Sequence, residues 1–249
     1  PGDEPRQIDW KLYARSDKFF VREAERDSPL IVWCLIDATA SMAQADAARP
    51  QWSRLQAAKA LTACVIELAL KQGDRFGLIA VSDQGLVVVN AGSGTKHRDQ
   101  CLLELHKLKA QGGWPNEAQC RPIWERIGAN TLVLLLSDDY DEGCVSLAER
   151  LAVARREVLS VQILTTEERD FPFQGGHRFR DAETDTELLT DAAASRSGFI
   201  EKFSAAKKML SSRFAASGIH HVEYVLDQPL DTPLRKFFLP RNTRFQESV

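Results

Sequence analysis

The sequence predicts a doubly wound α/β fold, a mostly parallel sheet flanked by helices, because apolar strands alternate with segments of helical length. Residues 30–36, LIVWCLI, form an apolar run that stops at Asp37. Residues 131–137, TLVLLLS, form a second such run and lead into Asp138 and Asp139. Apolar runs of this length are typical of strands covered on both faces. Segments of helical length separate the strands, and this favours parallel pairing within one sheet.

The first half of the chain supplies the elements around the first strand. A helix is expected over residues 53–72, because apolar side chains recur every three or four positions; they are Leu55, Ala58, Leu61, Val65 and Leu68. Residues 75–81 and 85–89 flank a tight turn and predict an antiparallel hairpin at one edge of the sheet. A helix over 95–110, a loop over 111–116 and a shorter helix ending near residue 127 follow.

The second half continues the alternation and interrupts it once. A helix over 144–156 and a strand over 158–165 follow the second acidic strand. Residues 170–190 are rich in turn formers and short alternations, which predicts an inserted β-hairpin. A helix over 191–216, a strand over 220–226 and a short helix over 230–238 complete the chain. We therefore expect one domain over residues 30–249, with residues 1–29 packed on it.

Composition excludes several classes of protein. The chain has 249 residues, with 32 basic and 35 acidic side chains and a net charge of -3, which argues against a nucleic-acid partner. The cysteines lack paired spacing, so we expect buried thiols in a reducing, cytoplasmic setting; they are Cys34, Cys64, Cys101, Cys120 and Cys144. No apolar run reaches transmembrane length. A membrane anchor upstream of Pro1 is the alternative to a purely cytoplasmic location.

The polar residues after the two acidic strands form the candidate site. Asp37, Thr39 and Ser41 are spaced two residues apart on one loop, and Asp138 follows the other strand. Carboxyl ends of parallel strands are where open α/β sheets bind ligands. An all-oxygen cluster suits a hard cation such as Mg²⁺. Taken singly, each residue is also a common turn former or helix cap.

These residues resemble the metal-ion-dependent adhesion site of von Willebrand factor type A domains, whose Rossmann-like fold the resemblance implies here. The opening segment resembles the signature of the bacterial family catalogued as domain of unknown function 58. The residues that carry this resemblance are Gly2-Asp3, Arg6, Ile8-Asp9-Trp10, Ala14-Arg15, Val21-Arg22-Glu23 and Phe171-Pro172-Phe173. The resemblance implies that Asp37, Thr39, Ser41 and Asp138 bind Mg²⁺ or Mn²⁺.

The chain departs from the metal-site pattern at two places. Thr39 replaces the first serine of the Asp-x-Ser-x-Ser motif and keeps its hydroxyl. Trp114 and Pro115 stand where the second loop of the family pattern carries a threonine, and neither side chain offers an oxygen. Asn116 is the nearest substitute, and Asp139 is a further candidate, each as a metal ligand or as a group that orients the ligands.

The most consistent function is protein recognition without catalysis. No nucleophile elbow, phosphate-binding loop or dinucleotide fingerprint is present. The resemblance implies a chaperone-like assembly role with a MoxR-type AAA+ ATPase, or with the client of that ATPase, as partner. One alternative is a metal-dependent hydrolase that uses the same acids. Another is a metal-free structural scaffold.

Overall fold

The structure is a computed structural model that describes residues 29–173, 176–180 and 187–237. The predicted packing of residues 1–29 on the domain falls almost entirely outside the described residues. Among the helices of the described part, none combines the length and apolar character needed to cross a bilayer.

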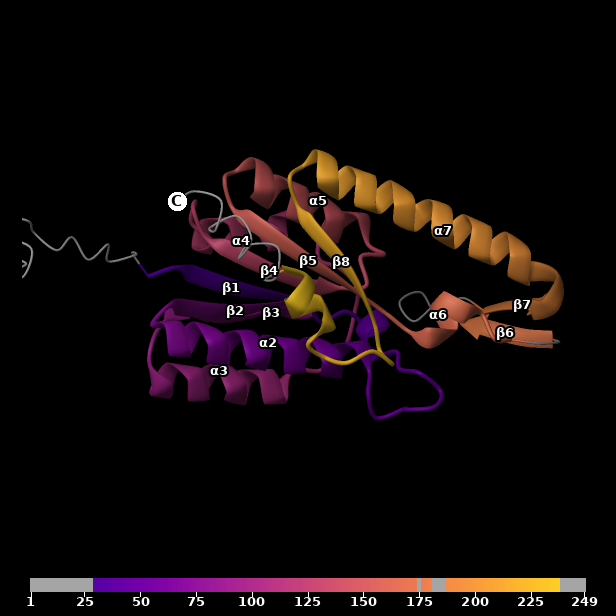
Figure 1. Ribbon diagram of the computed structural model, residues 1–249, viewed down its shortest axis with the longest axis horizontal. Helices are drawn as coiled ribbons and strands as arrows, with labels where there is room; N and C mark the ends of the chain where they lie inside the picture. The colour runs from indigo at the N-terminus through magenta and orange to yellow at the C-terminus, as the bar shows by residue number, and fades with distance from the viewer. Residues whose placement is uncertain (1–28, 174–175, 181–186, 238–249) are drawn as a thin grey trace, which may run out of the picture.

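The main sheet has six strands in the order β3-β2-β1-β4-β5-β8 (Figure 1). Their bounds are β1 Ile31–Asp37, β2 Arg75–Ser82, β3 Gly85–Gly92, β4 Leu132–Ser137, β5 Glu157–Leu164 and β8 His220–Val225. All neighbouring pairs are parallel except β2 and β3. The predicted mostly parallel sheet with one antiparallel edge strand is therefore confirmed.

Helices cover both faces of the sheet (Figure 1). One face carries α2 (Arg54–Gln72) and α3 (Thr95–Lys107). The other carries α4 (Glu117–Arg126), α5 (Glu142–Val153) and the C-terminal part of α7 (Ala192–Ala216). This is the doubly wound arrangement that the sequence predicts.

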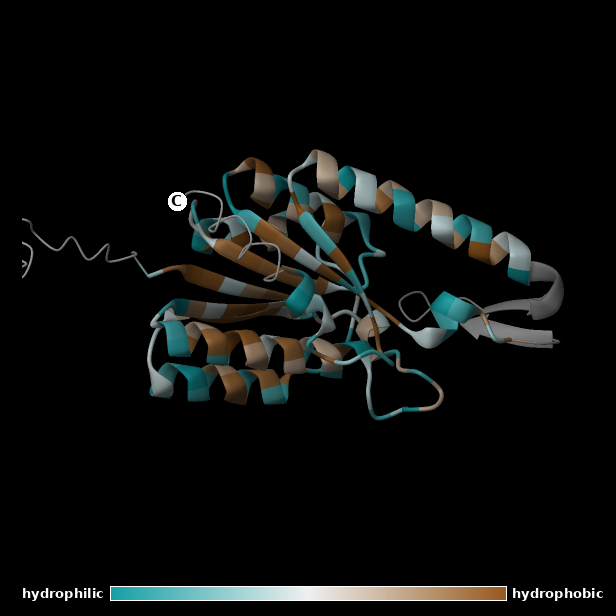
Figure 2. Ribbon diagram, in the orientation of Figure 1, coloured by the Kyte–Doolittle hydropathy of each residue, from teal (hydrophilic) through white to brown (hydrophobic). Residues whose placement is uncertain are grey.

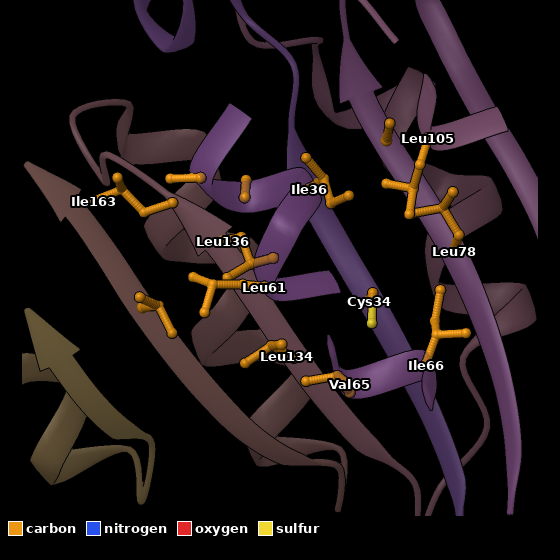
Figure 3. Packing of buried hydrophobic residues seen from close by; sticks show 14 of the residues in the cluster. Cys34, Ile36, Leu61, Val65, Ile66, Leu78, Leu105, Leu134, Leu136 and Ile163 are labelled. Atoms are coloured by element: carbon orange, nitrogen blue, oxygen red, sulfur yellow. The ribbon is translucent and has the colours of Figure 1, made fainter. Parts of the chain in front are cut away.

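The core follows from the alternation of side chains along the strands. Cys34 and Ile36 of β1 face α2 and α3, as Figure 3 shows. Trp33 and Leu35 face α4 and α5 instead. The strands are accordingly hydrophobic along most of their length (Figure 2), as expected for strands that are buried on both sides.

Two short elements and a hairpin complete the described residues. A 3-10 turn, η2 (Ala40–Ala43), follows β1, and α6 (Thr166–Asp170) follows β5. Strands β6 (Gly176–Arg180) and β7 (Glu187–Asp191) pair antiparallel in a separate sheet. This is the predicted inserted hairpin, and it lies at the end of α7 remote from the sheet (Figure 1). A final helix begins at residue 232.

Some sequence-based boundaries and burials are wrong. Helix α3 ends at Lys107 rather than near residue 110, because Leu108 turns into the core and its carbonyl accepts a 2.6 Å hydrogen bond from Lys59 Nζ. Helix α5 begins at Glu142 because Asp141 caps it. Cys64 and Leu68, expected to be buried, are exposed on α2.

Candidate functional site

The register of β1 and β4 brings the two acidic strand ends to one edge of the sheet. The strands pair in parallel, with Ile36 opposite Leu136. The Ser137 hydroxyl donates a 2.7 Å hydrogen bond to Asp37 Oδ2 and so links the two strand ends directly. We call the residues 37–41 and 138–141 the acidic edge.

The first loop of the acidic edge is folded around Asp37. Its Oδ1 accepts hydrogen bonds from the Thr39 backbone N–H at 2.9 Å and from Thr39 Oγ1 at 2.7 Å. Thr39 Oγ1 lies 3.1 Å from Ser41 Oγ. The structure therefore gathers the three predicted oxygen donors, with Asp37 only 2% exposed.

Burial dominates the electrostatics of the acids. It raises the pKa of Asp37 to about 6; the charge of Asp138 adds to this, and hydrogen bonds from Ser137 and Thr39 oppose it. Burial and the charge of Asp138 likewise raise the pKa of Asp139 to about 7, against a 3.2 Å hydrogen bond from Ser160 Oγ. A positive charge nearby lowers the free-energy cost of burying such crowded carboxylates.

Arg54, in the first turn of α2, supplies that positive charge. Its Nη1 lies 2.6 Å from Asp138 Oδ2 and 3.2 Å from the backbone oxygen of Ser41, so one nitrogen bridges both loops. Its Nη2 donates to Glu168 of α6. The guanidinium also lies 5.3 Å from the centroid of the Tyr140 ring. The side chain of Arg54 is 0% exposed.

The loop over 111–116 lies beside the first loop, as the metal-site pattern requires. Gln111 N–H donates to the Ala38 carbonyl at 2.9 Å, and Ala40 N–H donates to the Gly112 carbonyl at 2.8 Å. Trp114 packs instead against the start of α5: a Cβ placed on Gly143 would come within 2.5 Å of its ring.

Asn116 and Asp139 occupy different places from the first-loop donors. Asn116 Oδ1 accepts a 3.0 Å hydrogen bond from Gln119 N–H and caps α4. Asp139 is held in a left-handed backbone conformation, with φ of 58°, and its carboxylate turns toward Ser160 of β5. The side chain of Asn116 is thus used as a helix cap, and that of Asp139 as an acceptor inside the sheet edge.

Only part of the predicted set of oxygen donors is free to bind a divalent cation. Asp37, Thr39 and Ser41 offer neighbouring oxygens, but the second carboxylate, Asp138, is bound to the Arg54 guanidinium. Within the described part of the chain, no three His, Cys, Asp or Glu side chains are arranged to hold a metal ion. Arg54 places a positive charge beside Asp138, where the sequence predicts Mg²⁺ or Mn²⁺.

Sequence reasoning missed Arg54, Glu168 and Tyr140. A signal for Arg54 existed: it lies four residues before Ala58 and seven before Leu61, on the stripe of α2 that faces the core. An arginine in line with a buried apolar stripe needs an internal partner. No comparable local pattern identifies Glu168, which lies 114 residues further along the chain.

Comparison with known proteins assigns the chain to a family. A family model described as "Protein of unknown function DUF58" matches residues 1–209, and the chain belongs to this family. The relatives "Uncharacterized protein Rv1480" of Mycobacterium tuberculosis and "Uncharacterized protein Mb1516" of Mycobacterium bovis are each 26% identical over 191 residues. These matches cover 74% of this chain and 58% of each relative, so the chain spans little more than half of their length.

One solved structure shares the fold at a TM-score of 0.50, and two others match at lower scores. An aerotolerance-related membrane protein from Bacteroides fragilis has a TM-score of 0.50 at 16% identity, covering 86% of this chain and 99% of its own. BatB from Bacteroides thetaiotaomicron gives a TM-score of 0.49 at 16% identity, covering 88% and 100% of the two chains. The SpRpn10 VWA domain gives 0.47 at 14% identity, covering 84% and 95%. The sheet order and the family membership agree with the predicted von Willebrand factor A-like fold.

Proposed function

We propose that this chain is a non-catalytic protein-interaction domain that recognises its partner with the acidic edge. The observation that carries the proposal is the contrast between buried acids and an exposed aromatic side chain at the same place. Asp37 and Asp138 are each 2% exposed, whereas Tyr140 is 50% exposed.

Burial of the acids argues against catalysis at this edge. A general acid, base or nucleophile must reach the reacting atom of a substrate. Both oxygens of Asp37 accept hydrogen bonds from Thr39 or Ser137, and Oδ2 of Asp138 is bound to Arg54. These carboxylates hold the loops together and leave little surface for a substrate.

Tyr140 has the properties of an interface anchor. Tyrosine combines a large apolar ring with a polar hydroxyl, and it is enriched among residues that dominate binding energy. Here the hydroxyl is tethered by donating to Glu168, and one face of the ring contacts the Arg54 guanidinium. The exposed part of the ring is therefore held in place before a partner arrives, which lowers the entropic cost of binding.

The partner we propose is a MoxR-type AAA+ ATPase or the protein on which it acts. The resemblance of the chain to its family implies this partner, in a chaperone-like assembly role. The five cysteines are free, which is consistent with the reducing cytoplasmic setting that we propose for the complex.

The proposal is tested by binding of the purified chain to the MoxR-type ATPase of the same organism, measured by surface plasmon resonance. Tyr140→Ala should weaken binding about tenfold, because it removes an anchor of the recognition edge. Val153→Ala is the matched control: Val153 is 79% exposed at the opposite end of α5. Equal affinity of both variants and the wild type would locate recognition elsewhere.

A metal-dependent hydrolase at the same edge is the competing hypothesis. We expect no turnover of a generic phosphoester such as p-nitrophenyl phosphate, in Mg²⁺ or Mn²⁺, above that of an Asp37→Asn variant. Turnover by the wild type that disappears in Asp37→Asn would favour the hydrolase.

A further inference from the structure

We propose that Arg54 is the built-in cation of the acidic edge, so that the two loops are joined without a divalent metal ion. This role of Arg54 does not depend on the proposed function, because it concerns only the contacts that hold the acidic edge together. It can be tested without a partner protein.

The contacts of Arg54 reproduce what a bridging metal ion would do. One nitrogen, Nη1, contacts both the loop after β1, through the Ser41 carbonyl at 3.2 Å, and the loop after β4, through Asp138 Oδ2 at 2.6 Å. The second nitrogen, Nη2, extends the bridge to Glu168 of α6. Three segments far apart in sequence thus meet on one guanidinium.

The guanidinium disfavours a second cation beside Asp138. Arg54 is 0% exposed, and it is fixed by two carboxylates, a carbonyl and the Tyr140 ring. A divalent ion that used Asp138 would have to displace the arginine or approach it closely in a desolvated site, where like charges repel strongly. A guanidinium is also always charged and its planar fork suits several acceptors at once.

The second loop agrees with this inference from a separate observation. In the resembled metal site this loop supplies a hydroxyl, whereas here Trp114 packs toward Gly143 and Pro115 has no oxygen in its side chain. The chain therefore lacks a side-chain oxygen at Trp114 and Pro115 and has a buried cation, Arg54, beside Asp138.

The decisive experiment compares thermal unfolding in EDTA and in 10 mM Mg²⁺ or Mn²⁺. The wild type should give the same small response to metal as Asp37→Asn, which reports nonspecific ion effects.

Arg54→Met frees Asp138 beside Asp37, Thr39 and Ser41. This variant should be less stable in EDTA and should gain about 3–6 °C in Mg²⁺, the shift expected for a dissociation constant of about 1 mM. Adding Asp37→Asn to Arg54→Met should remove the gain.

Two further variants control for the loss of an arginine at the surface and for the loss of the positive charge at position 54. Arg213→Met removes another arginine that contacts two carboxylates, Glu142 and Glu149, at the surface, and should change neither the stability nor the metal response appreciably. Arg54→Lys keeps the positive charge and should remain unresponsive to metal even if Arg54→Met fails to fold.

Three results would overturn the inference. The first is a metal shift in the wild type that Asp37→Asn abolishes, because metal and arginine would then share the site. The second is an Arg54→Met protein as stable as the wild type in EDTA. The third is a folded Arg54→Met protein that gains nothing from metal, because the guanidinium would then not occupy the place of a cation.

Discussion

At the scale of single residues, the side chains of the acidic edge are held mainly by hydrogen bonds to other protein groups. Asp37 accepts from Thr39 and Ser137, and Asp138 accepts from Arg54. The predicted oxygen cluster on the first loop is present. Asp37 ends the strand, and the Thr39 hydroxyl, two residues further on, folds back to its carboxylate. The cation beside it could not be predicted from the loop, because Arg54 and Glu168 reach it from two other helices.

Gly143 provides a residue-scale test of how Trp114 is packed. A methyl group at position 143 would lie 2.5 Å from Trp114 Cδ1, so Gly143→Ala should lower the free energy of unfolding by about 1–3 kcal/mol. Gly198 in α7 has open space around it, and Gly198→Ala should raise the free energy by about 0.5–1 kcal/mol. Urea unfolding measures both. A Gly143→Ala protein as stable as the wild type would mean that Trp114 is free to move away.

At the scale of elements, most of the fold could be predicted, because its signals are local. Strands β1 and β4 are continuous apolar runs, and α2 shows a helical period, so both kinds of element were recognised from short windows of sequence. The end of α3 could not be predicted in this way. It depends on the insertion of Leu108 into the core and on a bond to Lys59, 49 residues away along the chain.

The start of α4 gives an element-scale prediction that separates a cap from a metal ligand. Asn116 and Gln119 form a reciprocal capping box. Asn116→Ala should therefore cost about 1 kcal/mol of unfolding free energy, and the same amount in EDTA and in Mg²⁺. Asn116→Asp keeps the capping oxygen and should cost little. A loss seen only in Mg²⁺ would instead identify Asn116 as a ligand.

At the scale of the whole molecule, stability depends on groups that folding has removed from water. His221 of β8 lies against the Phe214 ring at 5.2 Å, with Ser160 Oγ 3.4 Å from its Nδ1. Burial lowers the pKa of His221; Lys207 acts in the same direction and Glu223 opposes it. The folded state therefore binds this proton less readily than the unfolded chain does.

The sign of the pH dependence follows from that difference. Below the unfolded pKa of about 6.5 the unfolded chain takes up more protons at His221, so its contribution to stability is lost as the pH falls. Between pH 7.5 and pH 5.5, the wild type should lose more unfolding free energy than His221→Phe in urea titrations. The raised pKa values of Asp37 and Asp139 act in the opposite sense in both proteins. An equal loss in the two proteins would contradict the prediction.

The contacts of α6 and α7 have a mechanical consequence. Before the β6–β7 hairpin, Thr166 N–H donates to Asp46 Oδ1 at 2.8 Å, and Glu168 accepts a hydrogen bond from the Arg54 guanidinium. Near the C-terminal end of α7, Arg213 donates two hydrogen bonds to Glu142, one residue beyond the acidic edge. Residues 166–213 are therefore held near both ends by hydrogen bonds to Tyr140 of the acidic edge and to Glu142 beside it. A displacement of residues 166–213 would therefore act on the acidic edge through contacts at both ends of that segment.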